Sequence, residues 1–490
     1  MGGRAIKNPP VGTSVFDRLI RRAWPLGISV VYIILGLLYS FRWGSVVRHV
    51  PSLWITPGDL SDIFGASVAL AHGHLGAIYQ NRPTLREFPG ILIALAPVGA
   101  LSHAFHTTFV EIAKNHHLVS NPTFFESNTS TLWDGGTITS SAHIEYSVQP
   151  QWFVFVAPYV LALSCVALMA LDALAERLQV PRTRRAVLSL TEAVALWPVI
   201  VIWGHPEDAV AVALTVYALI LAMDRRWTGA GWLFGAAVAV QPLVVVVLPI
   251  LLAMAGTKRA LGLALRTFIP GVALTIPPLA LDFHGAVHDL VTAPAYPDVV
   301  GNHQTPWTAL SHRIGGRGTG TTIVGGPLRR LPTLAIAVAL GWWARRLRDR
   351  PEMIVWAMAV ALALRSYTEL VMTSYYMWPA LAVGLVVAAR GSARRFGVAV
   401  VIAVLVTVVA QWHLGVFLWW GLDVGGITAL LAVASRPQAL EDTGPSVADQ
   451  RGRAPARAQS GARPGAARQK ARPGATTART KSKSGRTTRR

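Results

Sequence analysis

Long apolar segments separated by short polar turns dominate the chain between residues 24 and 435. A helix that crosses a bilayer needs roughly 17–25 mostly apolar residues. Segments of about this kind occupy 24–41, 152–174, 187–203, 208–223, 228–256, 260–281, 330–344, 353–371, 374–389, 396–413 and 416–434. The pattern predicts an all-α polytopic integral membrane protein with about twelve transmembrane helices in one membrane domain, 24–435.

The segment 228–256 counts as two of these helices. It is too long for one span, and basic residues flank it on both sides, Arg225/Arg226 before it and Lys258/Arg259 after it. Gln241-Pro242 interrupts it, and proline removes a backbone donor and breaks a helix. We therefore expect two short half-helices that form a hairpin.

The segment 89–105 is apolar but short, and it contains two prolines. If it crossed the membrane, every later basic cluster would change sides. We expect instead a re-entrant or interfacial element, so that residues 43–151 form one large outer region.

The composition agrees with a membrane protein, because 52% of the residues are hydrophobic and only 14% are charged. A soluble protein carries roughly 25% charged residues. Arginine outnumbers lysine 39 to 6, which suggests a bacterial source and therefore a bacterial plasma membrane.

The net charge of +21 lies in short clusters between apolar segments and in the C-terminal tail, where residues 451–490 hold 13 Lys/Arg and no acid. Basic clusters of this kind are typical of cytoplasmic loops. The N-terminus (1–23) and the tail (436–490) are therefore predicted to be cytoplasmic, and the loops 43–151 and 282–327 to lie outside. The tail has almost no large apolar residue, so we expect it to be disordered and attracted to anionic membrane lipids. Nucleic-acid binding is not expected.

Cys165 is the only cysteine and lies in an apolar segment, which excludes disulfides within the chain and cysteine-based metal sites. The histidine pairs His72/His74 and His116/His117 have no accompanying frame of carboxylates. No metal site is predicted.

Asp59 and Asp62 are the first candidates for chemistry. They begin the segment 59–79, which reads as an amphipathic helix lying at the membrane interface on the outer side. Residues three apart share a helix face, so the two carboxylates should lie together. Asp59 follows Pro57-Gly58 and could equally cap the helix, because aspartate is a favoured N-cap.

The stretch Gly58-Asp59-Leu60-Ser61-Asp62-Ile63-Phe64, with Ala71 to Tyr79 after it, resembles the first outer loop of GT-C fold polyprenyl-phosphate-dependent glycosyltransferases. It is most similar to glycosyltransferase family 87 (the DUF2029 type), which includes actinobacterial mannosyltransferases. Looser similarities continue the pattern at Phe88-Pro89-Gly90, Ala237 to Pro242, Gly301 to Thr305 and Thr373 to Pro379. The second proline of the first of these motifs is missing here, Gln241 stands where the family has lysine, and the insert 106–150 departs from the family.

The resemblance implies a GT-C-like membrane domain and a glycosyltransferase active on the outer side of the membrane. The donor would be a sugar on polyprenyl phosphate, with mannose expected, and the acceptor would be a cell-envelope glycolipid or glycan. Asp59, with Asp62 as the second candidate, would be the general base of an inverting transfer.

The leaving phosphate needs positive or hydrogen-bonding partners. Candidates at the outer side for donor phosphate or substrate binding are His205, Glu207, Asp208, His303, His312, Arg313, Arg365 and Tyr375. A purely structural role is the alternative for several of them. Arg365 could pair with Glu369 one helical turn on, and Glu207 and Asp208 could stabilise the start of a helix. No cofactor is required, although a divalent cation is compatible with the chemistry.

A transporter or flippase of lipid-linked sugars is the alternative function, because twelve helices and a broken hairpin also fit that class. Transporters concentrate polar residues at the bilayer midplane, whereas the candidates here cluster in outer loops and at outer helix ends. A scaffold without activity is the third reading.

Overall fold

The structure is a computed structural model, and it describes residues 22–48, 58–79, 85, 87–104, 129–131, 137–139, 155–292, 305–309, 330–412 and 414–435. The predicted disordered tail, 436–490, lies outside this part of the chain, as does most of the 106–150 insert.

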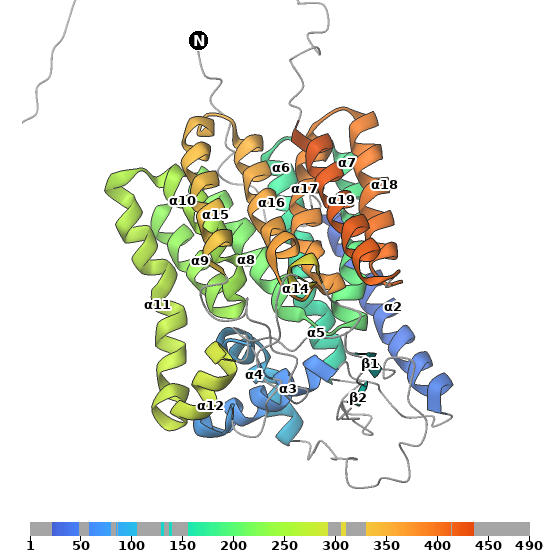
Figure 1. Cartoon of the computed structure of the whole chain (residues 1–490), viewed down its shortest axis with the longest axis vertical. Helices are drawn as coiled ribbons and strands as arrows, with labels where there is room; N and C mark the ends of the chain where they lie inside the picture. Colours follow the sequence, from blue (N-terminus) through green and yellow to red (C-terminus); the bar gives the residue numbers. More distant parts are fainter. Residues whose placement is uncertain are drawn as a thin grey trace, which may run out of the picture. The chain divides into compact units, whose positions relative to one another are not determined.

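Helices occupy the apolar segments that the sequence predicts (Figure 1). They are α2 (Ala23–Arg48), α5 (Ala157–Ser164) with α6 (Val166–Arg177), α7 (Arg182–Trp197) with η4 (Pro198–Ile202), α8 (Pro206–Met223), α9 (Trp227–Val240), η5 (Pro242–Val247) with α10 (Leu248–Ala255), α11 (Thr257–Leu281), α15 (Leu331–Ala344), α16 (Pro351–Thr368), η9 (Ser374–Met377) with α17 (Trp378–Arg390), α18 (Ala393–Val409) and α19 (Val416–Ser435).

Shorter elements lie between them. They are α3 (Gly58–Ala71), η1 (Leu75–Ala77), α4 (Pro89–Ala104), α12 (Phe283–Val287), η6 (His288–Thr292), α14 (Pro306–Ala309), η8 (Arg345–Leu347) and the strands β1 (Thr129–Thr131) and β2 (Thr137–Thr139). The two strands pair antiparallel, with Ser130 opposite Ile138.

Five helical stretches of the described chain are long and apolar enough to cross a membrane. They are Ala157–Arg177, Arg182–Ile202, Pro206–Met223, Thr257–Leu281 and Phe417–Ser435. The helical membrane-protein class is therefore confirmed in its coarse form, while the count of about twelve spans stays a prediction.

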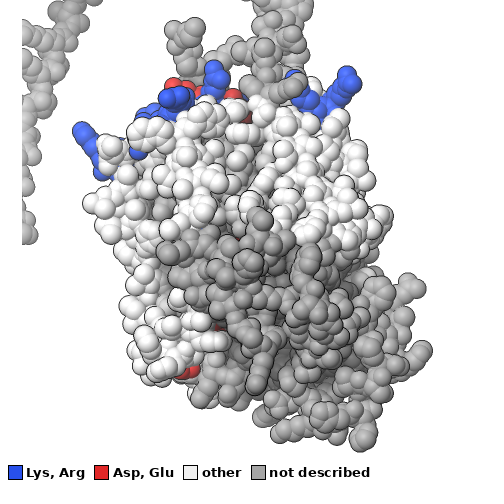
Figure 2. Space-filling model, in the orientation of Figure 1, with Lys and Arg blue, Asp and Glu red and all other residues white. Residues whose placement is uncertain are grey.

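The turns α6–α7, α8–α9, α10–α11, α15–α16 and α17–α18 all lie at one end of the helices (Figure 1), and each has arginine or lysine in the turn or in the adjoining helix ends. Figure 2 shows these cations gathered along one edge, with an almost uncharged belt beside them. We call this the basic end. The elements α3, α4 and α12 lie at the opposite end (Figure 1).

The helix α9 ends at Val240, where Gln241 adopts an extended backbone (φ −140°, ψ 101°), and η5 begins at Pro242. The apolar segment 228–256 is therefore two helical arms that meet at Gln241-Pro242, as the sequence predicts. Both arms start from turns of the basic end, so the tip lies toward the opposite end.

The predicted re-entrant segment, 89–105, contains the helix α4. This helix packs near the tip between α9 and η5. A Cβ atom at Gly90 would lie 2.5 Å from the carbonyl group of Ala239, and one at Gly99 would lie 3.1 Å from the carbonyl oxygen of Ser67. Glycine therefore allows α4 to touch the main chains of both α9 and α3.

The helix α3 differs from the expected interfacial helix. Its apolar residues Leu60, Ile63 and Phe64 are buried in the protein core, and α3 packs on α4. The apolar face that we expected at the membrane interface is covered by protein, because α4 offers it an apolar surface.

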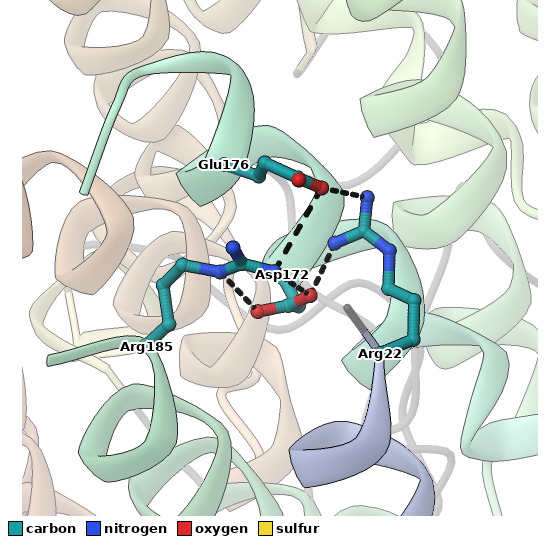
Figure 3. A network of polar contacts seen from close by, with 4 residues as sticks. All are labelled: Arg22, Asp172, Glu176 and Arg185. Carbon is teal, nitrogen blue, oxygen red and sulfur yellow. Dashed lines mark hydrogen bonds and ion pairs between the residues drawn. The ribbon is translucent and has the colours of Figure 1, made fainter. Parts of the chain in front are cut away.

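Four charged residues form a network at the basic end (Figure 3). Asp172 on α6 is 2% exposed and accepts hydrogen bonds from Arg185 Nε at 2.7 Å and Arg185 Nη2 at 2.6 Å. Arg22, just before α2, pairs with Asp172 as well and reaches Glu176 Oε2 at 2.5 Å. The network ties the start of α2 to α6 and α7.

We expect Asp172→Asn to lower the free energy of unfolding by about 3–5 kcal/mol, because Arg22 and Arg185 would lose the charge that balances them. Denaturation in mixed detergent micelles measures this loss. Asp224→Asn is the matched control: its pair with Arg177 is more open, with Asp224 35% exposed, and should contribute about 0–1 kcal/mol. Equal losses in both variants would contradict a structural role for the network.

Candidate functional site

Three buried polar side chains lie at the turn between η4 and α8, away from the basic end. Gly204 takes φ +76° and turns the chain, and Pro206 then opens α8. His205, Glu207 and Asp208 are 4%, 1% and 2% exposed. Glu207 and Asp208 therefore stand in the first turn of a helix, as the sequence allowed, and their side chains are buried in protein.

The His205 imidazole meets the Glu207 carboxylate, with Nδ1 2.5 Å from Oε1. A carboxylate that contacts one ring nitrogen orients the imidazole and selects which nitrogen carries the proton. The pair can therefore hold His205 in one orientation for contact with a ligand.

Asp208 joins two further elements. Gln241 Nε2, at the tip between α9 and η5, donates to Asp208 Oδ1 at 3.1 Å, and Arg365 Nη1 on α16 lies 3.4 Å from the same oxygen. One carboxylate thus connects α8, the hairpin tip and the end of α16.

The alternative role of Arg365, pairing with Glu369 one helical turn on, requires α16 to continue as far as Glu369. The helix α16 ends at Thr368, and Glu369 has an extended backbone, so it does not continue the helical turn. Glu369 Oε1 instead lies 3.7 Å from Arg330 Nε, while Arg365 turns to Asp208.

Aromatic rings surround Arg365 and His205. The His205 ring stacks on Tyr375, with centroids 3.7 Å apart, and Trp203 lies 5.9 Å from the same tyrosine. The guanidinium carbon of Arg365 lies 3.4 Å from the centroid of the Tyr376 ring. Tyr375 and Tyr376 meet edge to face at 4.9 Å. Ring faces stabilise cations, so they hold Arg365 and orient His205.

Several polar atoms of this cluster lack a hydrogen-bond partner within the described chain. They are Glu207 Oε2, Asp208 Oδ2 and Arg365 Nε. Leaving a buried polar atom unsatisfied costs about 1–3 kcal/mol. Such atoms are suited to contact a polar ligand or water.

Glu87, His205 and Glu207 are the described residues that could hold a metal ion, with one potential ligand atom from each lying within 4.8 Å of the others. Nitrogen and carboxylate ligands of this kind suit a divalent cation. The sequence prediction missed Glu87. The one feature that could have indicated it is its position directly before Phe88 and the apolar segment that follows.

Glu87 also connects the site to η1. Tyr79 donates to the Glu87 carbonyl oxygen at 3.0 Å. Burial raises the pKa of Tyr79, and the negative charges of Glu87 and Asp289 raise it further. Tyr79 therefore stays a neutral hydrogen-bond donor at physiological pH.

The structure brings together five of the predicted site residues: His205, Glu207, Asp208, Arg365 and Tyr375. Gln241 and Tyr376 join them and were not predicted as site residues. His303, His312 and Arg313 lie outside the described residues. Asp59 and Asp62 belong to the backbone of α3, but their side chains also lie outside the described part.

The described segment 305–309, inside the predicted loop 282–327, reaches the site. Thr305 Oγ1 donates to the carbonyl oxygens of Glu369 at 3.0 Å and Leu370 at 3.1 Å. This loop therefore approaches the connection between α16 and η9, which carries Tyr375.

No family model matches the sequence, and no curated protein is significantly similar to it. The resemblance to family 87 glycosyltransferases therefore rests on the short motifs alone.

We expect Arg365→Met to destabilise the protein by about 3–5 kcal/mol, because it leaves Asp208 buried without its cation. The double variant Arg365→Met/Asp208→Asn should recover much of that loss, because it removes the uncompensated charge. Denaturation in mixed micelles measures both.

Arg330→Gln is the control for this cycle. Arg330 is 39% exposed and its pair with Glu369 is long, so the loss should stay below about 1 kcal/mol. A loss in the double variant at least as large as that of Arg365→Met alone would contradict the interaction of Arg365 with Asp208.

Proposed function

We propose that this protein is a membrane glycosyltransferase. In this proposal it transfers a sugar, with mannose as the first candidate, from polyprenyl phosphate to a cell-envelope glycolipid or glycan. The observation that carries the proposal is the buried cluster of His205, Glu207, Asp208 and Arg365 at the end of the helices opposite the basic clusters. A GT-C-like domain of about twelve spans, with both termini in the cytoplasm, would set this cluster at the outer face of the plasma membrane.

The chemistry of the cluster suits a phosphate leaving group. In a single inverting displacement, an acceptor hydroxyl oxygen bonds to the anomeric carbon while the bond from that carbon to the phosphate oxygen breaks. Donors already held in place stabilise the charge that develops on the departing phosphate. Arg365, held over Tyr376, and His205, held by Glu207, are the described groups able to do so.

The proton of the acceptor hydroxyl must go to a base. Asp59 or Asp62, at the start of α3, takes this role in the proposal, as the family resemblance implies. The helix α3 packs on α4, and α4 packs against the end of α9, next to Gln241. These backbone contacts support a place for α3 near the cluster. A divalent cation at Glu87, His205 and Glu207 is compatible with this scheme and not required by it.

A transporter of lipid-linked sugars is the second candidate, and one observation favours it. Glu192 on α7 and Asp423 on α19 are both fully buried, and neither carboxylate has a hydrogen-bond partner within the described chain. Buried acids inside membrane spans mark ion or proton pathways in many transporters. The tests below separate the two functions.

The proposed sidedness predicts which positions a membrane-impermeant maleimide reaches in intact cells. A cysteine at His284, which is exposed on α12, should be labelled, and one at Thr228, exposed at the basic end, should react only after lysis. The native Cys165 is buried and should stay unlabelled, which makes the wild type a background control. The reverse pattern would place the cluster in the cytoplasm.

Purified protein should transfer radiolabelled mannose from polyprenyl phosphate to an extract of envelope glycolipids. If Asp59 is the base, Asp59→Asn should slow transfer by about 10²–10⁴-fold, because the acceptor hydroxyl loses its proton acceptor. Asp62→Asn should then have a smaller effect.

Asp349→Asn, in the α15–α16 turn of the basic end, is the control and should keep wild-type activity. Failure of the wild type with both mannose and arabinofuranose donors would contradict the glycosyltransferase. Movement of the intact donor across a vesicle membrane, without transfer, would identify a transporter.

A further inference from the structure

A pocket of about 750 Å³ opens at the basic end between the α8–α9 turn and the first turns of α11. Its lining includes five cations, and none of the lining residues is acidic: Leu221, Arg225, Arg226, Trp227, Thr228, Gly229, Lys258, Arg259, Gly262 and Arg266. The nearby Asp224 is engaged by Arg177 at 2.7 Å. The charge of the lining residues therefore favours binding of an anion.

The position of Arg266 sets the pocket apart from an ordinary basic loop. Arg266 lines it, yet Arg266 belongs to Thr257–Leu281, a helix long and apolar enough to cross a membrane. Its Nη1 donates to the Gly262 carbonyl oxygen at 2.8 Å, and no acid pairs with it within the described chain. A charge inside a membrane helix is costly unless it is paired or faces a polar cavity. Arg266 satisfies this condition by facing the pocket.

The helices α9 and α11, which both contribute residues to the pocket, pack closely against each other. A Cβ atom at Gly235 would lie 2.4 Å from the Arg266 carbonyl oxygen, and one at Gly231 would lie 2.9 Å from Arg266 Cβ. The spacing of these glycines is a small-xxx-small pattern that lets helices in a membrane approach closely. At the mouth, Arg259 lies 6.0 Å from the centroid of the Trp227 ring.

The outer surface of α11 supplies an apolar track beside these cations. Leu261, Leu265, Phe268 and Val272 are 71%, 55%, 47% and 57% exposed. Their spacing places them on one stripe of the helix, next to the stripe of Lys258, Gly262 and Arg266. A polar head in the pocket could thus continue into apolar chains along α11.

We propose that this pocket binds the phosphate headgroup of an anionic phospholipid, whose acyl chains lie along α11. Basic pockets between membrane helices on the cytoplasmic side bind such headgroups through the same combination of charge and adjacent apolar surface. The inference is independent of the glycosyltransferase proposal, because the pocket lies at the end of the helices opposite the His205 cluster.

Native mass spectrometry of the full-length protein in neutral detergent tests this proposal with dioleoyl phosphatidylglycerol as the probe. The wild type should bind this lipid in preference to dioleoyl phosphatidylcholine. Each cation removed should lower the affinity about five-fold, so Lys258→Gln/Arg259→Gln/Arg266→Gln should lose about a hundred-fold.

The variant Arg225→Gln/Arg226→Gln is a second test that should leave the fold intact, because both side chains are exposed and lie outside the helices. Its affinity for the lipid should fall about 25-fold. Arg390→Gln/Arg394→Gln removes two cations of the same end that do not line the pocket, and should bind like the wild type.

Three outcomes would overturn the proposal. The first is equal affinity of the wild type and the triple variant, and the second is an equal loss in the Arg390/Arg394 control. In the third, inorganic pyrophosphate would displace the lipid at a similar concentration, which would assign the pocket to a soluble polyphosphate instead. Weak or absent competition by pyrophosphate supports the lipid, since the acyl chains then contribute to binding.

Discussion

The high cost of placing a charge among apolar helices organises this molecule. An ionised group removed from water without a partner costs several kcal/mol or more. The described chain meets this constraint by setting arginine and lysine in and beside the turns of one end, and by surrounding several of the deeper charges with partners. Asp172 between Arg22 and Arg185, and Arg365 between Asp208 and Tyr376, are two solutions to the same problem.

The two ends of the helices consequently differ in chemistry. The basic end presents exposed cations and a pocket without acids, which suits anionic lipid. The opposite end buries histidine, carboxylates and arginine together, with several atoms still able to accept or donate. Polar groups enclosed in this way interact strongly with a ligand, because water no longer screens them. The proposed chemistry and the proposed lipid binding therefore occupy separate places.

Glycine residues allow helices that reach from one end to the other to pack closely against their neighbours. At Gly90 and Gly235, main-chain atoms of a neighbouring helix occupy the space that a Cβ atom would need. These contacts hold α4 against the end of α9, and α9 against α11. The hairpin tip at Gln241 is thereby fixed beside the candidate site, while the other end of α9 borders the basic pocket.

The sequence alone determined the helical membrane class, the position of most helices, the break at Gln241-Pro242 and the residue types available for chemistry. Each of these depends on local composition or on apolar runs, which need no knowledge of distant contacts. Only the tertiary structure decided which charge meets which. Arg365 pairs with Asp208, 157 positions away, and α16 ends at Thr368, so Glu369 does not lie one helical turn beyond Arg365. Glu87 and Tyr376 also belong to the site, although the sequence did not indicate them. Their roles depend on packing between helices, and a local sequence pattern does not contain that information.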